Sequence, residues 1–233
     1  RGLRRVRGRL PAGLRTNGIQ HEIDISMQKT GKFFRAFAPL LRLVFPLRER
    51  PNEEQLLSGA VYLCRHGNNA GPPYTFLYLA GQVRPWVYSV FYEEKACFAH
   101  TYRYTFLQRC GLPRPIAWLA ARLSAFFAPK ILRALNAIPV YRNGAQSMVT
   151  LRESVRALLG GDSILLFPDV NYTSENGEIG ELYRGFLLLE RMYCAKTGRH
   201  LPFVPIAVKP RRRIAIGRPV LFGDGDPEEQ MNS

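Results

Sequence analysis

The sequence predicts an α/β fold, with a single domain built on a mixed, mostly parallel sheet that is flanked by helices. Short apolar runs rich in β-branched and aromatic residues alternate with segments of helical period, which is typical of strands that alternate with helices. With 233 residues, 46% of them hydrophobic, the chain can build one large core. Ser163 to Phe167 is the clearest run, and its unbroken apolar character indicates a strand buried on both faces of a parallel sheet.

The other elements follow from local period, turn residues and prolines. The first strand is expected to start at Val61 and to end at His66. Further strands are expected at 86–91, 137–142, 203–208, 214–216 and 220–222. Helices are expected at 74–80, 99–110, 115–127, 148–159 and 184–195, with a polar loop from 170 to 180.

One of these helices, at 115–127, is apolar around most of its circumference, and we expect Pro129 to end it. A core helix and a helix that faces a membrane or lines an acyl chain would both have this pattern. The longest stretch without a charged residue, from 67 to 83, contains Asn, Gly and Pro and cannot form a spanning helix of about 20 residues.

The chain is expected to have three parts. Residues 1–26 are rich in Arg and Gly without period, and we interpret them as a basic extension that is disordered or non-native, with Met27 as the true initiator. Residues 27–50 hold an amphipathic helix, with Phe33 and Phe37 on one face and Arg35 and Arg42 on the other. This helix either packs on its own domain or lies in a membrane interface. Residues 51–233 are expected to form the main α/β domain, and its last residues, 226–230, resemble the start of a helix.

Charge and cysteine content restrict the partners. The formal net charge is +15, which favours an anionic surface or an anionic substrate. The four cysteines are widely separated and no histidine stands at zinc-ligand spacing, so the sequence suggests neither a disulfide framework nor a metal site. We expect reduced thiols of an intracellular protein. A nucleic-acid partner is not expected, because the arginines are dispersed and no nucleic-acid-binding motif appears.

His66 is the first candidate for chemistry. It follows a buried run directly and precedes a polar loop and then Pro72 and Pro73, which can open a helix. In open α/β sheets, ligands bind in the loops at the carboxyl ends of strands. A histidine that only closes a turn by a hydrogen bond would give the same pattern.

Five segments together resemble the PlsC-like glycerolipid acyltransferases, a family that includes lysophosphatidate and glycerol-3-phosphate acyltransferases. The resemblance covers about residues 30–222. In chain order the segments are His66 at the start of a His-x4-Asp-like loop, Ile138-Pro139-Val140-Tyr141-Arg142, Phe167-Pro168-Asp169 with Arg184-Gly185 downstream, Val204-Pro205-Ile206-Ala207-Val208, and Ile216-Gly217-Arg218-Pro219.

The resemblance implies a glycerol-3-phosphate acyltransferase-like fold and an O-acyltransferase of phospholipid biosynthesis. His66 would take the proton of an acceptor hydroxyl as the hydroxyl attacks an acyl thioester. Arg142, Asp169, Arg184 and Gly185 would bind the phosphorylated glycerolipid acceptor. The acyl donor would be acyl-CoA or an acyl carrier protein, with no metal and no other cofactor. The protein would be cytoplasmic and peripheral, on the inner face of an anionic membrane surface.

Two positions depart from the family pattern. Gly71 stands where the family has the aspartate that orients the histidine, and Asp169-Val170-Asn171-Tyr172 stands in place of Glu-Gly-Thr-Arg. Asn68, Asn69 or Asp169 could replace the missing orienter, because an asparagine has this role in papain-like proteases. The alternative function is a catalytically silent acyltransferase-like fold that binds lipid or acyl carrier protein.

Overall fold

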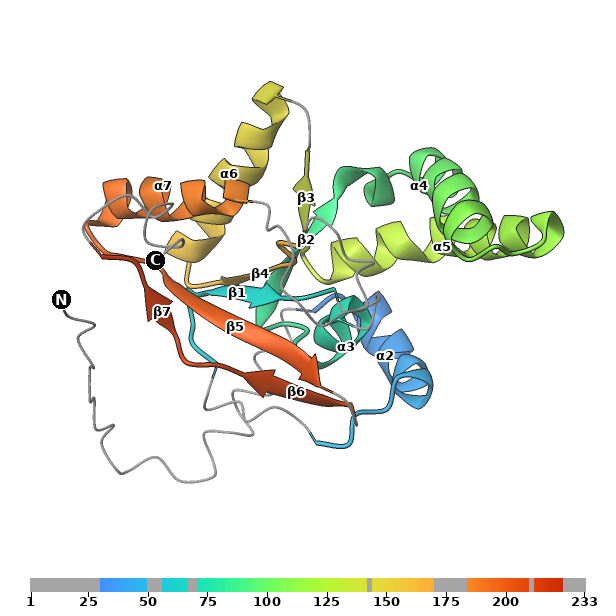
Figure 1. Cartoon of the computed structure of the whole chain (residues 1–233), viewed down its shortest axis with the longest axis horizontal. Coiled ribbons are helices and arrows are strands. Elements are labelled where there is room, and N and C mark those ends of the chain that lie inside the picture. The colour runs from blue at the N-terminus through green and yellow to red at the C-terminus, as the bar shows by residue number, and fades with distance from the viewer. Residues whose placement is uncertain are drawn as a thin grey trace.

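The computed structural model describes residues 30–49, 56–66, 71–141, 144–169, 184–209 and 212–223 (Figure 1). Residues 1–29, which include the expected basic extension and Met27, lie outside this set, as does the expected loop 170–180. The strands are β1 (Val61–Cys64), β2 (Val83–Tyr88), β3 (Ile138–Val140), β4 (Ser163–Leu166), β5 (Pro202–Lys209), β6 (Arg213–Ile216) and β7 (Val220–Leu221). The α-helices are α2 (Lys32–Val44), α3 (Gly71–Tyr78), α4 (Glu94–His100), α5 (Arg114–Ala134), α6 (Gly144–Leu159) and α7 (Leu187–Thr197). Two 3₁₀ turns, η2 (Ser89–Tyr92) and η4 (Arg184–Phe186), and a π-helix, η3 (Thr101–Arg109), complete the described elements.

The strands form one mixed sheet in the order β3-β2-β4-β1-β5-β6, and β7 also pairs with β5. Strands β1 to β5 pair in parallel, whereas β6 and β7 pair antiparallel to β5. The expected α/β architecture with a mostly parallel sheet flanked by helices is therefore confirmed. All five parallel strands end at the same edge of the sheet, which is the edge where His66 lies.

Helices cover both faces of the sheet, because the apolar side chains of each strand alternate between the two faces. Val61 and Ile164 pack on one face with the apolar side of α6 and with α7. Tyr62 and Leu165 pack on the other face with α3. Figure 1 shows α6 and α7 together on one side of the strands and α3 with α2 on the other.

Helix α2 does not expose all of its basic face. Phe33 and Phe37 stack against Phe127 of α5, so α2 rests on the neighbouring helix. Arg42, on the face opposite these phenylalanines, lies over the ring of Tyr78 at 5.8 Å from the ring centre. The alternative in which α2 packs on its own domain thus holds for the phenylalanine side of this helix.

Several boundaries differ from the sequence prediction. β2 begins and ends three residues before the expected strand, and α6 begins at Gly144 rather than at Met148. The expected end of α5 at Pro129 is wrong, since the helix continues to Ala134. A proline removes only one helical hydrogen bond, and the burial of Pro129, Leu132 and Ala134 in tertiary contacts keeps the following turn helical.

A buried carboxylate fixes α7 to the start of β5. Glu190 is 2% exposed, and one of its oxygens accepts a hydrogen bond from the backbone N–H of Leu201 at 2.8 Å. Its other oxygen lies 2.6 Å from Nδ1 of His200. These contacts satisfy a buried charge that would otherwise be strongly unfavourable.

We expect Glu190→Ala to lower the free energy of unfolding by about 2–4 kcal/mol, because it leaves the buried N–H of Leu201 without an acceptor and opens a cavity. Glu190→Gln keeps the size of the side chain and a carbonyl acceptor, and should lose clearly less. Urea denaturation of the two variants measures the difference. Equal midpoints for wild type and Glu190→Ala would rule out this role.

Candidate active site

The candidate site lies at the carboxyl ends of β1 and β4, which are neighbours in the sheet. The helix that follows β1, α3, covers one face of the sheet, whereas α7, which follows β4 in the chain, covers the other. The two connections therefore leave in opposite directions. In open α/β sheets such a switch point is the place where ligands bind.

The register of β1 and β4 brings His66 and Asp169 together. Val61 pairs with Ile164 and Leu63 with Leu166, and the same offset continues past both strand ends to His66 and Asp169. The backbone N–H of His66 donates to the carboxylate of Asp169, at 3.0 Å from Oδ2 and 3.2 Å from Oδ1. Nδ1 of the same histidine lies 3.2 Å from Oδ2, close enough for an ion pair but too oblique for a straight hydrogen bond.

The surroundings of this pair suit a charged acid next to an accessible base. The side chain of Asp169 is 9% exposed and that of His66 is 26% exposed. Burial alone would raise the pKa of the Asp169 carboxyl, but its hydrogen bonds and electrostatic attraction to His66 outweigh burial and lower the pKa from its ordinary 3.8. The ring of Phe167 packs on the imidazole, with 4.8 Å between the ring centres, and limits its rotation.

Gly71 fits this site because it has no side chain. Its N–H donates to the carbonyl oxygen of His66 at 2.8 Å, which closes the turn that leads into α3. A Cβ atom at this position would collide with the carbonyl oxygen of Arg65 and lie 3.1 Å from that of His66. An aspartate therefore cannot occupy position 71 in this backbone, and the carboxylate beside the imidazole comes from β4 instead.

Cys64 lies two residues before His66 and is buried. Burial raises the pKa of its thiol to about 12, and the nearby carboxylate of Asp169 adds to the shift. Since the thiolate is the reactive form of cysteine, burial and the raised pKa both disfavour Cys64 as a nucleophile. The histidine remains as the group that can accept a proton.

The other residues expected in the site are placed only in part. Arg142, Asn68 and Asn69 lie outside the described residues, and so does the side chain of Arg184. Gly185 lies in η4, directly before α7.

The end of β3, next to Arg142, is fixed firmly to α6. The Thr150 hydroxyl donates to the carbonyl oxygen of Pro139 at 2.7 Å and accepts from the N–H of Tyr141 at 3.3 Å. The chain before Arg142 is thus held at the same edge of the sheet as His66.

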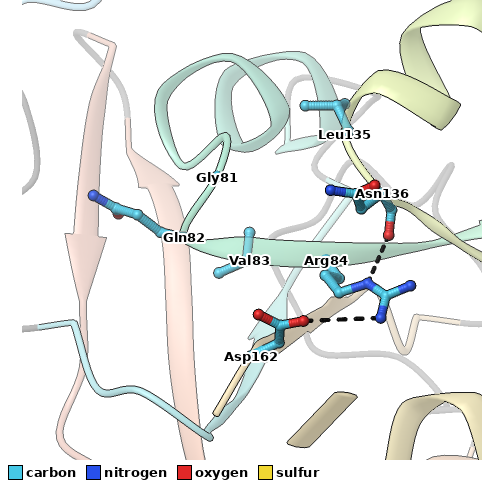
Figure 2. A pocket seen from close by; sticks show the side chains of 7 residues that line it. All are labelled: Gly81, Gln82, Val83, Arg84, Leu135, Asn136 and Asp162. Atoms are coloured by element: carbon cyan, nitrogen blue, oxygen red, sulfur yellow. Dashed lines mark hydrogen bonds and ion pairs between the residues drawn. The ribbon is translucent and has the colours of Figure 1, made fainter. Parts of the chain in front are cut away.

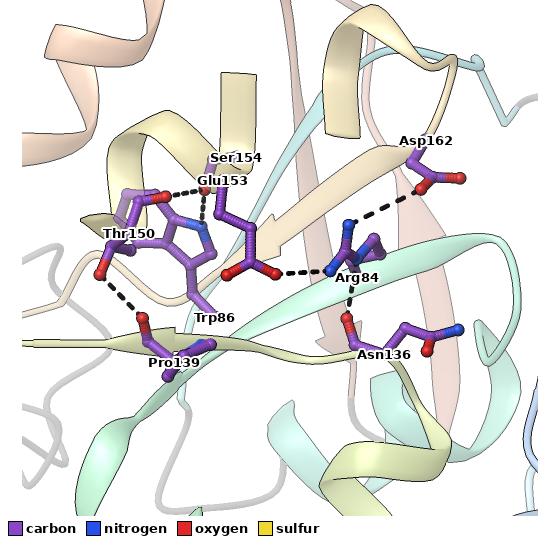
Figure 3. A network of polar contacts seen from close by, with 8 residues as sticks. All are labelled: Arg84, Trp86, Asn136, Pro139, Thr150, Glu153, Ser154 and Asp162. Carbon is purple, nitrogen blue, oxygen red and sulfur yellow. Dashed lines mark hydrogen bonds and ion pairs between the residues drawn. The ribbon is translucent and has the colours of Figure 1, made fainter. Parts of the chain in front are cut away.

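A shallow pocket of about 240 Å³ lies at the opposite edge, where β2 and β4 begin (Figure 2). The charged residues that line it are Arg84 and Asp162. Nε of Arg84 donates to the carbonyl oxygen of Asn136 at 2.8 Å, and its Nη1 lies 3.9 Å from Asp162. Figure 3 shows that Arg84 also reaches Glu153 of α6, at 2.8 Å. Because the guanidinium of Arg84 already has partners on several sides, we interpret the pocket as part of the connection between α6 and the sheet and not as a site for chemistry.

A group of side chains with metal-binding atoms also lies away from His66. Atoms of Glu190, Cys194 and His200 that could bind a metal ion lie within 4.8 Å of one another at the start of β5. Both oxygens of Glu190 already have partners in the protein, the backbone of Leu201 and the ring of His200. The arrangement is accounted for as a structural contact between α7 and β5.

The sequence suggests Asp169 both as an acceptor-binding residue and as a possible orienter of His66, and its contacts with His66 fit the second role. The sequence did not indicate why position 71 is a glycine, or that Phe167 packs on the imidazole of His66. A sequence signal existed for the pairing, because both residues follow buried strands directly. Only the order of strands in the sheet shows that those two strands are neighbours.

We expect Gly71→Ala to lower the free energy of unfolding by about 2–3 kcal/mol, because the added methyl group must displace backbone atoms. Gly160→Ala is the matched control, since a Cβ there would come no closer than 3.3 Å to its neighbour. The control should change the free energy by less than about 1 kcal/mol. Chemical denaturation of both variants tests the difference, and similar losses would contradict a special role for Gly71.

Asp169 should also contribute to stability in a pH-dependent way. Its pKa is lower in the folded chain than its ordinary value of 3.8, so the folded state binds its proton less readily than the unfolded state. The contribution is therefore complete above 3.8 and is lost as the pH falls through the folded pKa. We expect Asp169→Asn to flatten the acid side of the stability profile, measured as urea midpoint against pH. A profile parallel to that of wild type would refute the assignment.

Comparison of the chain with protein-family models, with curated proteins and with solved structures finds no match. The candidate site is therefore described by its own geometry: a partly exposed histidine and a partly buried aspartate, at a switch point of a mostly parallel sheet.

Proposed function

We propose that the protein is an O-acyltransferase with a glycerol-3-phosphate acyltransferase-like fold. It would move a fatty acyl group from the thioester of coenzyme A or acyl carrier protein to a hydroxyl of a lysophospholipid or glycerophosphate. The acceptor would be met at the cytoplasmic face of a membrane. Neither a metal nor another cofactor would take part.

The contact between His66 and Asp169 is the observation that carries this proposal. The strongest objection from the sequence was the loss of the aspartate at position 71, and a carboxylate lies beside the imidazole nonetheless. The carboxylate 3.2 Å from Nδ1 stabilises the positive charge that the ring gains when its other nitrogen, Nε2, accepts a proton. Such a histidine is ready to accept the proton of an alcohol.

In the proposed reaction, Nε2 of His66 removes the hydroxyl proton while the hydroxyl oxygen forms a bond to the thioester carbon. The C–S bond then breaks, and the departing sulfur takes the proton back from the imidazolium. Asp169 keeps the ring in place and stabilises its positive charge between the two steps. Arginine side chains expected near the sheet edge, Arg142 and Arg184, would bind the phosphate of the acceptor.

The second candidate is a catalytically silent fold that binds lipid or acyl carrier protein. The sequence after Pro168 favours it, because Asp169-Val170-Asn171-Tyr172 replaces the glycine, threonine and arginine that the family uses with the acceptor. In this function, the contact between His66 and Asp169 would only hold the ends of β1 and β4 together.

Transfer of a labelled acyl group from acyl-CoA to lysophosphatidate distinguishes the two. We expect His66→Ala to lower kcat by roughly 10³-fold or more, and Asp169→Asn by roughly 10²–10⁴-fold, because the imidazole loses its orienting charge. The Michaelis constants should change little, since neither side chain is assigned to phosphate binding in this mechanism.

Asp162→Asn is the matched control. Asp162 precedes β4 at the opposite edge of the sheet, whereas Asp169 follows it, so the same substitution is made at the two ends of one strand. The control should keep wild-type turnover. Equal activity in wild type and His66→Ala would exclude His66 as the base, and no transfer by wild type with either donor would favour the silent fold.

A further inference from the structure

The outer surface of helix α5 carries a row of exposed apolar side chains. Four large apolar residues, at helical spacings of three and four, lie along its outer side, and about half of each is exposed: Ile116 at 55%, Leu119 at 56%, Leu123 at 52% and Phe126 at 50%. We call these four residues the α5 stripe. Single exposed apolar residues are common, but a continuous row of this kind marks a surface that contacts something.

The inner side of α5 explains why the helix does not turn this stripe inward. Ala117, Ala121 and Ala125 are almost fully buried and face the opposite side of the helix. Their small side chains allow close packing on the rest of the α4–α5 arm, which we define as residues 94–134 and which projects to one side of the sheet in Figure 1. The sequence left open whether this helix is a core helix or an outward-facing apolar helix. In the structure, its inner side is buried like a core helix and its outer side is exposed.

The charge of the arm identifies what the stripe would contact. Residues 94–134 contain seven Lys and Arg and one Glu. A second copy of this chain would bring two such basic arms together, and their charges would repel one another across a short distance. An anionic bilayer offers both an apolar layer for the stripe and negative charge for the arm.

The helix is suited to lie in the interface rather than to cross the bilayer. The helix has 21 residues, and the most apolar 18-residue stretch within it has a mean hydropathy of 1.2, which satisfies the length and composition of a spanning helix. However, Arg122 lies in its middle, more than half exposed and 3.6 Å from Glu94, and the inner side is covered by protein. Lys130, whose Nζ lies 2.9 Å from the ring centre of Phe126, places its charge beside the apolar row, as lysines do at an interface.

We propose that the α5 stripe docks the protein on an anionic lipid bilayer, with its four side chains in the boundary between head groups and acyl chains. This inference rests on the proposed function in one respect: a lysophospholipid acceptor resides in such a bilayer, so docking there would serve acyl transfer. The observations behind the docking are separate, because they concern the surface of the arm and not His66. The stripe would hold the arm flat against the lipid surface, at the part of the chain that follows β2.

Flotation of the full-length chain with vesicles tests the proposal. Vesicles of phosphatidylcholine alone are compared with vesicles of equal parts phosphatidylcholine and phosphatidylserine. Wild type should float with the anionic vesicles and much less with the neutral ones. We expect the double variant L119E/L123E to have a partition coefficient for anionic vesicles that is lower by roughly tenfold or more, because each leucine would contribute to lipid binding by burying apolar surface.

The matched control is V149E/L159E, which makes the same change of charge at two exposed apolar residues of α6. It should bind anionic vesicles like wild type. As a second readout, lipids with brominated chains should quench the emission of Trp118, taken as the difference between wild type and Trp118→Phe. Trp118 is 51% exposed on the same helix, about a third of a turn away from the stripe, so its quenching reports that this part of the arm reaches the bilayer without any change in the stripe itself.

Three results would overturn the proposal: no binding of wild type to anionic vesicles, equal loss in the stripe variant and the α6 control, or a dimer in sedimentation that L119E/L123E dissociates without any lipid binding. Failure of the proposed function has a different signature. If the chemistry is wrong but the docking is right, vesicle binding persists with no acyl transfer. If only the docking is wrong, wild type transfers the acyl group but does not bind anionic vesicles.

Discussion

The parallel pairing of β1 with β4 is the constraint on which the candidate site depends. Hydrogen bonds along these two strands fix a register in which Val61 lies opposite Ile164, and an offset of one residue would turn each side chain to the other face. Both strands are buried on both faces, so the apolar core specifies this register strongly. The same register places His66 beside Asp169 just beyond the strand ends. A contact made by two loop residues is in this way positioned by the most rigid part of the sheet.

The turn after β1 explains why the acid comes from another strand. Gly71 approaches the carbonyl oxygens of Arg65 and His66 so closely that a side chain is excluded. The carboxylate next to the imidazole comes instead from Asp169, beyond the end of the neighbouring strand β4. Asp169 also accepts from the backbone N–H of His66, so one carboxylate holds both the ring and the main chain of the candidate base.

The α4–α5 arm and the candidate site are joined through the sheet. The arm follows β2 and leads into β3, and the parallel strands β2 and β3 end at the same edge as β1. Helix α2 packs against the base of the arm through Phe33, Phe37 and Phe127. A surface that binds lipid at this position would bring the carboxyl edge of the sheet close to the bilayer. The chemistry of a base at that edge and the affinity of the arm for lipid would then serve the same reaction.

The sequence by itself determined the alternation of strands and helices, the buried character of β4 and the position of His66 at a strand end, because these features depend on local period and on residue type. It also separated an apolar helix at 115–127 from its surroundings, although it could not assign its two sides. The prediction that this helix ends at Pro129 was wrong, because tertiary contacts at Leu132 and Ala134 override the local effect of the proline.

Only the tertiary structure decided which strand lies next to β1, and so which acid reaches His66. Strand order is set by packing over the whole sheet, and residues about a hundred positions apart become neighbours through it. The close approach at Gly71 and the exposure of the α5 stripe were likewise decided in three dimensions, because both depend on which atoms lie nearby and not on the residues adjacent in the chain.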